Sequence, residues 1–334
     1  MRALITASFA PSGLELLRRH MEIVHEDWRQ SKHIYLEAAK LADKIRAERA
    51  DVLIVEADFV LDEAISQTDL RLIGSCRGDP NNIAMAAATA KRIPVLFTPA
   101  RNADAVADLT LGFILALLRN IYTVNHGLKS GSMAFGSIAD YLTAYERYGG
   151  YELGGRVVGV IGFGAIGRRV VARCRAFGAP ILVYDPFVAA DEVAAAGAEP
   201  VELDDLMRRA DIVTLHCPDT PDNRGLISAA RIAAMKPGGY FLNLARAAVV
   251  DDDALYEALR SGRLAGGALD VFAQEPVRHD NRFVLLDNVL VAPHLGGATR
   301  DVVVHQTKMM VDDVLAWIEG RRPRYVANPQ VLSA

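Results

Sequence analysis

Three charged side chains, Arg246, Glu275 and His294, each follow a stretch of the chain that is expected to form a buried strand. Histidine suits proton transfer because its ordinary pKa of about 6.5 lets it hold and release a proton near neutrality. A neighbouring carboxylate such as Glu275 would orient the imidazole ring and stabilise its protonated form. Arginine holds a carboxylate through two hydrogen bonds and stays charged at any working pH. Together these residue types suit the reduction of a ketone that carries a carboxylate, or the reverse oxidation.

Each of these side chains, taken singly, also has a purely structural interpretation. His294 would be a histidine whose hydrogen bonds are satisfied in the core, Glu275 a helix cap, and Arg246 a member of a surface ion pair. The spacing along the chain does not by itself bring the three together. The catalytic interpretation therefore depends on the elements that position them.

A glycine-rich segment, Gly162-Phe163-Gly164-Ala165-Ile166-Gly167, directly follows the apolar stretch 157–161 and opens a predicted helix over 165–177. In a dinucleotide-binding turn with this spacing, the first glycine allows the tight turn and the second lets the backbone approach a pyrophosphate. The third glycine lets the helix pack close to the strand. The N-terminus of the helix then offers free N–H groups to the phosphates.

Asp185 ends the next predicted strand, where a carboxylate would accept hydrogen bonds from the adenosine ribose of the dinucleotide. A carboxylate there also repels a 2′-phosphate, which favours NAD over NADP as the cofactor. Arg168 and Arg169 on the predicted helix would soften this preference if they faced the cofactor. The structural alternative is a glycine-rich turn beside a solvated aspartate. His216, at the end of a further strand, is expected to line the cofactor site without taking part in the chemistry.

Apolar runs alternate with helical periodicity throughout the chain, which predicts parallel sheets with crossover helices. Ligands of such sheets bind beyond the carboxyl ends of the strands, where the candidate side chains lie. Strands are expected at 2–6, 52–55, 72–76, 95–97, 157–161, 181–184, 212–215, 240–244, 268–271 and 289–291. Helices are expected at 12–20, 34–49, 82–91, 103–125, 165–177 and 300–319. The segment 127–155 is expected to be an irregular excursion with a short helix near 138–147.

The composition is that of an ordinary globular protein with 334 residues, which is enough for two domains. A net charge of -4 without a basic patch argues against nucleic acid or an anionic membrane as a partner. The apolar runs are shorter than the roughly 18 residues of a membrane span, and no signal-peptide pattern begins the chain, so we expect a cytoplasmic protein. The three cysteines are far apart and predict neither a disulfide framework nor a metal site.

With these motifs the chain resembles the D-isomer-specific 2-hydroxy acid dehydrogenases, the family of D-3-phosphoglycerate, D-lactate, glycerate and glyoxylate/hydroxypyruvate dehydrogenases. The resemblance covers almost the whole length. It is carried by four motifs in the family's order: Gly162–Gly167 with Asp185, Asn243–Asp251, Leu269–Pro276 and Pro293–Thr299.

The resemblance implies an α/β protein with two Rossmann-like doubly wound domains. Residues 1–100 and 297–334 would form a discontinuous, flavodoxin-like substrate domain. Residues 101–296 would form the NAD-binding Rossmann domain, through which two chains would join as a homodimer.

The activity that the resemblance implies is hydride transfer between NAD and a D-2-hydroxy acid or its 2-oxo acid. His294 would be the acid/base, Glu275 would support it, and Arg246 would bind the substrate's carboxylate and carbonyl. Asp270 would approach the nicotinamide carboxamide. The expected cofactor contacts are Gly162, Gly164, Ala165, Ile166, Gly167, Asp185, His216, Cys217, Pro218, Ala245 and Asp270.

The substrate loop departs from the family's common pattern. Many members have a second glycine where Asp79 stands and an aspartate where Ala84 stands. Loop amides hold the substrate carboxylate in the family, so Asp79 puts the identity of the acid in question. Three alternatives stay open: Asp79 points away, Asp79 contacts a substrate hydroxyl, or Arg77 instead grips a second acidic group or a phosphate. Arg77, Gly78 and Asp79 are therefore the expected substrate contacts, and a small polar or phosphorylated acid is the expected substrate.

Two further departures concern the cofactor domain. Ala247 replaces the glycine that usually follows the arginine, and alanine disfavours a positive φ. The segment 127–155 is about ten residues longer than we expect from the usual lengths of loops between secondary-structure elements. Its tyrosines, Tyr141, Tyr145 and Tyr148, are expected to add to a dimer contact or to reach a neighbouring cleft.

Two alternative functions remain open at this stage. A corepressor-like protein of the same fold would sense the dinucleotide and bind a protein partner, with turnover incidental. An enzyme of the same family could instead act on an inorganic anion such as phosphite. The fold does not separate these cases, because one architecture hosts many functions.

Overall fold

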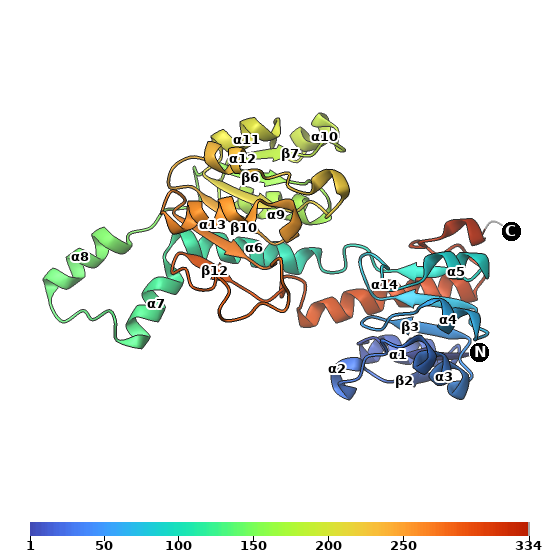
Figure 1. The fold of residues 1–334 in the computed structure, drawn as a ribbon. Helices are drawn as coiled ribbons and strands as arrows, with labels where there is room; N and C mark the ends of the chain where they lie inside the picture. The colour runs from blue at the N-terminus through green and yellow to red at the C-terminus, as the bar shows by residue number, and fades with distance from the viewer. Residues whose placement is uncertain (333–334) are drawn as a thin grey trace. The chain divides into compact units, whose positions relative to one another are not determined.

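The computed structural model describes residues 1–332, and the chain divides into two compact units. Unit 1 consists of Met1–Asn102 together with the chain from Thr299 onward, and unit 2 consists of Ala103–Ala298. Each unit is built on a parallel sheet with helices on its faces (Figure 1). The α/β fold class with two doubly wound domains is thereby confirmed.

Unit 1 contains a five-stranded parallel sheet in the order β2-β1-β3-β4-β5, which is the flavodoxin-like order. Its strands are β1 (Arg2–Ile5), β2 (Glu22–His25), β3 (Val52–Val55), β4 (Leu72–Ser75) and β5 (Val95–Phe97). Its helices are α1 (Pro11–Arg18), α2 (Trp28–Ser31), α3 (Ala38–Glu48), α4 (Asp62–Ser66), α5 (Met85–Ala90) and α14 (Arg300–Ile318), with the 3₁₀ turn η3 (Pro329–Leu332).

Unit 2 contains a seven-stranded parallel sheet in the order β12-β11-β10-β9-β6-β7-β8. Counted within the unit, this is the Rossmann order with one strand added, so the strand order reverses between β6 and β9. The strands are β6 (Val158–Ile161), β7 (Ile181–Tyr184), β8 (Glu199–Pro200), β9 (Ile212–Leu215), β10 (Tyr240–Asn243), β11 (Gly266–Leu269) and β12 (Val289–Val291).

The helices of unit 2 cover both faces of this sheet and also form the segment that precedes β6. They are α6 (Ala103–Leu118), α7 (Ile121–Ser130), α8 (Ile138–Tyr148), α9 (Ala165–Ala176), α10 (Ala190–Ala195), α11 (Leu203–Arg209), α12 (Ala229–Ala234) and α13 (Asp252–Arg260), with the 3₁₀ turns η1 (Pro221–Asn223) and η2 (Ala247–Val249).

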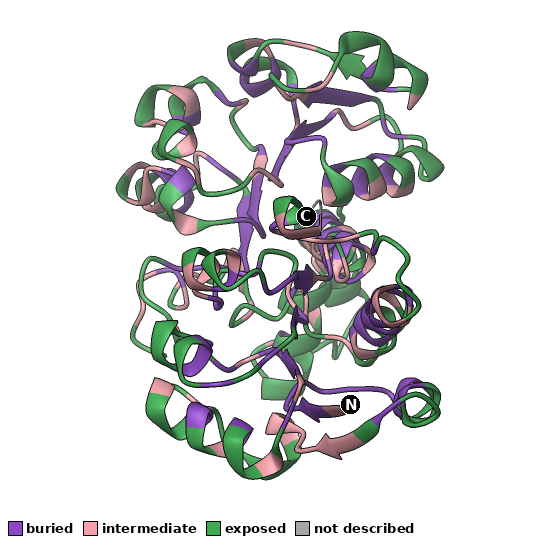
Figure 2. Cartoon of the chain, turned by 90° about the vertical axis from the view of Figure 1, so that its right-hand side faces the viewer, coloured by how far each residue is buried: buried purple, intermediate pink, exposed green. Residues whose placement is uncertain are grey.

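Alternation along the strands builds a core on each face of both sheets. In unit 1, Ile54 packs with α1 and α14, whereas its neighbours Leu53 and Val55 pack with α3 and α4. Successive side chains of a strand point to opposite faces, so a strand covered on both faces is apolar at every position. Figure 2 shows most strands buried and the helices exposed on their outer surfaces, whereas the edge strands β2 and β8 are not buried.

The helix predicted over 103–125 is interrupted, and this prediction was wrong. α6 ends at Leu118, Asn120 takes a left-handed conformation (φ 53°, ψ 30°), and α7 leaves at a bend of 66°. Asparagine tolerates this conformation better than most residues. Two hydrogen bonds to residues 148–151 satisfy polar groups at this break: Tyr151 N donates to Leu118 O (2.8 Å), and Asn120 Nδ2 donates to Tyr148 O (3.1 Å).

The irregular excursion expected from residue 127 begins later than predicted, because α7 continues to Ser130. The short helix expected near 138–147 is confirmed as α8. Its first turn carries a capping box, in which Ser137 Oγ accepts from Asp140 N and the Asp140 carboxylate accepts from Ser137 N. None of the residues of α8 is buried, and Figure 1 shows α8 standing away from the sheet of unit 2.

Strand β11 lies two residues earlier than predicted, at Gly266–Leu269 instead of 268–271. Two glycines, Gly266 and Gly267, lead this strand. In the structure they allow close packing, because a Cβ on Gly266 would lie 2.9 Å from Asn288 O and one on Gly267 would lie 3.2 Å from Leu259.

No single helix within residues 1–332 is long and apolar enough to cross a membrane. The bent pair α6 and α7 has the length and the apolar composition of a membrane span only when the two helices are taken together.

Candidate functional site

The glycine-rich turn joins β6 to α9 at the point where the strand order of unit 2 reverses. Gly162 has φ +95°, and a Cβ there would lie 2.8 Å from the backbone of His216 and Cys217. A Cβ on Gly167 would lie 2.0 Å from Gly162 O, so the helix packs directly on the turn. Gly164 is the N-cap of α9. A Cβ on Gly164 would meet no atom within 4 Å, so its backbone faces open space.

Asp185 is held at the end of β7, against the glycine-rich turn. One carboxylate oxygen accepts from Phe163 N (2.7 Å) and the other accepts from Phe187 N (2.9 Å). Each carboxylate oxygen can accept a second hydrogen bond. The carboxylate is therefore positioned by the backbone and still able to accept from a ribose hydroxyl.

A cavity of about 230 Å³ lies over this turn. Six of the predicted cofactor contacts line it: Gly162, Gly164, Asp185, His216, Cys217 and Pro218. It is completed by residues that the sequence analysis did not single out: Ile161, Tyr184, Pro186, Phe187, Thr220, Asp222, Asn223 and Leu226. The remaining predicted cofactor contacts, Ala165, Ile166, Gly167, Ala245 and Asp270, do not line this cavity.

His216 and Cys217 are both unsuited to chemistry at neutral pH. Burial lowers the pKa of His216 to about 3, so its ring is neutral, and Nε2 lies 3.0 Å from Thr214 Oγ1. Burial raises the pKa of the Cys217 thiol to about 11, so the thiol stays protonated. Both residues therefore contribute shape and polarity to the cavity wall.

These features fit a dinucleotide. The backbone at Gly164 leaves room for a phosphate group at the N-terminus of the twelve-residue helix α9. His216 Nδ1 is buried without a hydrogen-bond partner among residues 1–332, which leaves one ring nitrogen available to a ligand. Asp185 offers an acceptor of the kind that an adenosine ribose requires.

His294 and Glu275 form a direct pair in the same unit. His294 Nδ1 lies 2.8 Å from Glu275 Oε2, and Glu275 Oε1 accepts from Phe272 N (3.1 Å). The His294 side chain is half exposed, so the other ring nitrogen, Nε2, is free to meet a ligand. Burial acts to raise the pKa of Glu275, but the hydrogen bonds from His294 and Phe272 outweigh it, and the pKa lies below its ordinary value.

A buried carboxylate positions the loop that carries His294. Asp270 is 2% exposed, and its two oxygens accept from Leu295 N (2.7 Å) and Gly296 N (2.8 Å). His294 N donates to Asp270 O (2.9 Å), and His294 itself has φ 56°, which non-glycine residues rarely adopt. Asp270 thus acts on the loop, and both of its oxygens are engaged by backbone N–H groups.

Arg246 lies beyond the end of β10 with an exposed side chain. No hydrogen bond joins it to the pair, but its charge contributes to the low pKa of Glu275. Asn243 fixes this turn: its Oδ1 accepts from Ala245 N (3.0 Å) and its Nδ2 donates to Arg246 O (2.9 Å). The sequence placed Asn243 in a family motif but assigned it no role, although a polar residue closing an apolar strand was a usable signal. Ala247 begins η2 without a positive φ, so the alanine causes no strain there.

The three predicted substrate residues lie in unit 1, after β4. The guanidinium of Arg77 faces inward, donating to Glu56 O (2.6 Å), Ala57 O (3.3 Å) and Asn81 Oδ1 (2.9 Å). This engagement argues against the expectation that Arg77 grips an acidic group of the substrate. Gly78 and Asp79 are exposed at the carboxyl edge of the sheet.

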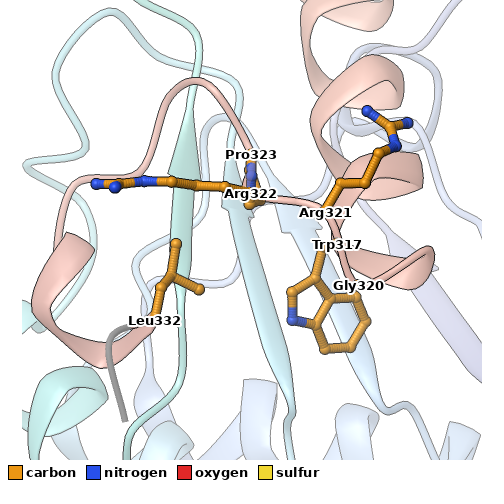
Figure 3. A pocket seen from close by; sticks show the side chains of 6 residues that line it. All are labelled: Trp317, Gly320, Arg321, Arg322, Pro323 and Leu332. Atoms are coloured by element: carbon orange, nitrogen blue, oxygen red, sulfur yellow. The ribbon is translucent and has the colours of Figure 1, made fainter.

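A second cavity, of about 310 Å³, lies elsewhere in unit 1 and includes none of the predicted site residues (Figure 3). It is lined by Trp317, Gly320, Arg321, Arg322 and Pro323, at and after the end of α14, and by Leu332 of η3. Among residues 1–332, no group of three or more His, Cys, Asp and Glu side chains is arranged to hold a metal ion.

Comparison with known proteins agrees with this geometry. Residues 111–296 match the family described as D-isomer specific 2-hydroxyacid dehydrogenase, NAD binding domain. The chain is 36% identical to YoaD of Bacillus subtilis (strain 168), a provisionally named 2-hydroxyacid dehydrogenase, over 95% of this chain and 91% of the relative. It is 32% identical to the glyoxylate reductase of Thermococcus onnurineus (strain NA1), over 99% of this chain and 97% of the relative. The crystal structure of the TT0316 protein from Thermus thermophilus superimposes with a TM-score of 0.83 at 31% identity, covering 98% of this chain and all (100%) of the other.

Replacing Gly162 with alanine should weaken NADH binding by about tenfold or more, because the new Cβ meets backbone that cannot move aside. Fluorescence titration with NADH measures the dissociation constant. Gly225→Ala is the matched control, since Gly225 also has a positive φ (65°) but would meet no atom within 4 Å. An equal loss of NADH affinity in the two variants would show that backbone strain, and not the close approach at the turn, causes the weaker binding.

Proposed function

The chain belongs to the D-isomer-specific 2-hydroxyacid dehydrogenase family of NAD-dependent oxidoreductases, and we propose that it interconverts a small polar D-2-hydroxy acid and its 2-oxo acid. The single observation that supports the acid–base chemistry best is the 2.8 Å contact between His294 Nδ1 and Glu275 Oε2. It belongs to the same unit as the dinucleotide cavity and follows strands of the same sheet.

Bound NAD supplies the hydride acceptor of the oxidation, or as NADH the hydride donor of the reduction. In our proposal His294 Nε2 donates a proton to the ketone oxygen during reduction and removes it from the hydroxyl during oxidation. Glu275 holds the ring by Nδ1, which leaves Nε2 directed at the substrate and stabilises the positive charge of the imidazolium.

Arg246 is the proposed anchor for the carboxylate and carbonyl of the substrate. Its guanidinium is exposed, and among residues 1–332 only one of its donors is bound, from an Nη to Ala245 O (2.7 Å). The remaining N–H groups suit two parallel hydrogen bonds to a carboxylate. Binding the substrate at its carboxylate would leave the adjacent carbonyl carbon to be aligned by the same side chain.

The cofactor would be held by the turn and walls of the cavity in unit 2. We propose that Gly162, Gly164, Ala165, Ile166 and Gly167 approach the pyrophosphate through their backbone, and that Asp185 accepts from the adenosine ribose. His216, Cys217 and Pro218 would form the facing wall, with Ala245 nearby.

Asp270 would have two roles. The hydrogen bonds to its two oxygens support positioning of the His294 loop, and because each carboxylate oxygen can accept a second hydrogen bond, we propose that Asp270 also approaches the nicotinamide carboxamide.

Unit 1 would supply the substrate loop. With Arg77 engaged by backbone carbonyls, we propose that Arg77 positions the loop, and that the exposed backbone N–H groups at Gly78 and Asp79 meet the acid. Asp79 would then face a hydroxyl group of the substrate, which favours a polar acid. The discontinuous unit 1 would thus serve as the substrate domain, and unit 2 as the cofactor domain.

The test is NADH oxidation against glyoxylate, hydroxypyruvate, pyruvate, phosphohydroxypyruvate and four-carbon sugar-acid analogues. His294→Asn should lower kcat by about a hundredfold or more, the usual contribution of a general acid–base group, while NADH binding is retained. His279→Asn is the control, because His279 is exposed in the same unit. Full turnover by His294→Asn would rule out the acid–base role. If the native protein binds NADH tightly but oxidises it with none of these acids, the result would favour the sensing function or an inorganic anion as the substrate.

Glu275→Gln should shift the pH profile of ketone reduction toward lower pH. The lowered pKa of Glu275 keeps its carboxylate ionised beside His294 throughout the working range, and the neutral amide no longer stabilises the protonated ring. The measurement is kcat against pH for the best ketone. A uniform loss of activity with an unchanged profile would mean that Glu275 only holds the ring in place.

We also propose that α7 and α8 form the contact of a homodimer. α8 presents large apolar side chains to solvent, with Ile138 77%, Leu142 61% and Tyr145 67% exposed. A contiguous exposed apolar surface of this kind is characteristic of an interaction site.

Ile138→Asp together with Leu142→Asp should convert the dimer to a monomer, measured by light scattering, because charge is depleted from the core of interfaces. Leu285→Asp, at a single position that is 69% exposed outside α8, is the control. A monomeric native protein, or an unchanged dimer in the double variant, would contradict the proposed interface.

A further inference from the structure

The charge of the dinucleotide cavity comes from carboxylates alone. Among residues 1–332, those that line the cavity include no lysine or arginine, but they include two carboxylates, Asp185 and Asp222. His216, the remaining basic side chain of the lining, is neutral because burial lowers its pKa to about 3.

The two carboxylates stand on different walls of the cavity. Asp185 follows β7, and Asp222 belongs to η1, which follows β9. These two strands flank β6, from which the glycine-rich turn leaves the sheet. A ribose held by Asp185 beside that turn would therefore have Asp222 on the facing wall.

The Asp222 carboxylate is exposed, and it makes no hydrogen bond or ion pair with any of residues 1–332. Its neighbour in the same loop, Asp219, pairs with Arg224 at 2.9 Å. Asp222 thus carries a negative charge that no side chain among the described residues neutralises, on a surface where a ligand binds.

The arginines of α9 do not offset this charge. Arg168 is paired with Glu192 at 2.8 Å and lies over the Phe163 ring, and Arg169 is paired with Asp104 at 2.9 Å. The softening of cofactor preference that these arginines could have caused is therefore not supported by their contacts.

We infer that Asp222 is a second determinant of cofactor choice, which acts with Asp185 to exclude NADP. The 2′-phosphate of NADP adds up to two negative charges beside the adenosine ribose, and unpaired carboxylates on two walls of the cavity repel it. Asp185 also serves NAD by accepting hydrogen bonds from the ribose, whereas Asp222 acts through repulsion. Removing Asp222 should therefore favour NADPH relative to NADH.

The experiment measures equilibrium dissociation constants of NADH and NADPH by fluorescence at low ionic strength. Asp222→Asn should lower the ratio of the NADPH to the NADH dissociation constant by about three- to tenfold, as expected for one charge acting through partly solvated space. At high salt the gain should shrink, because screening weakens interactions between exposed charges. Combined with Asp185→Ser, the effects on the ratio of the two constants should multiply.

Asp219→Asn is the matched control, because Asp219 lies in the same loop and is already neutralised by Arg224. An unchanged ratio in Asp222→Asn at low salt would overturn the inference. So would an equal change in Asp219→Asn, which would indicate a general effect of the loop's charge. The inference rests on NAD binding and not on the roles of His294 and Glu275, so binding measurements distinguish its failure from a failure of the proposed reaction.

Discussion

Asp270 is a buried carboxylate whose two oxygens each accept a hydrogen bond from the loop that carries His294. Burial of Asp270 raises its pKa, and the two N–H groups compensate that effect in part. An unpaired charge in such surroundings is costly, so the loop is held where it satisfies the carboxylate. This bonding keeps His294 in a left-handed conformation that few non-glycine residues adopt, and the ring then meets Glu275. The geometry of the proposed acid–base pair thus depends on a residue that is not itself part of it.

The cofactor side of unit 2 follows from close backbone contact. Gly162 and Gly167 allow the turn, β9 and α9 to approach one another at distances that no side chain permits. The space saved there leaves Gly164 facing the cavity and brings Phe163 N to the carboxylate of Asp185. One short segment therefore sets the proposed phosphate position and the proposed ribose acceptor together.

In unit 1, as at Asp270 in unit 2, a buried carboxylate organises the loops at the carboxyl edge of the sheet. Glu56 is 6% exposed and accepts from Ser8 N (3.2 Å) and Trp28 Nε1 (3.1 Å), while it pairs with Arg101 at 3.2 Å. The backbone carbonyl of Glu56 in turn receives Arg77 (2.6 Å). A buried, fully bonded network of this kind makes the loops at the strand ends rigid, which is what a site built on loops requires.

The sequence by itself determined the fold class, most strand positions and the family, because apolar runs, glycine spacing and a terminal acidic residue are local signals. Which side chains meet was decided by tertiary structure. The pairing of His294 with Glu275, the engagement of Arg77 by backbone carbonyls and the free carboxylate of Asp222 depend on how separate loops come together. The break after α6 likewise depends on Tyr148 and Tyr151, which lie about thirty residues further along the chain. Local pattern predicts an element, but hydrogen bonds between residues distant in sequence decide where it ends and which of its side chains remain free.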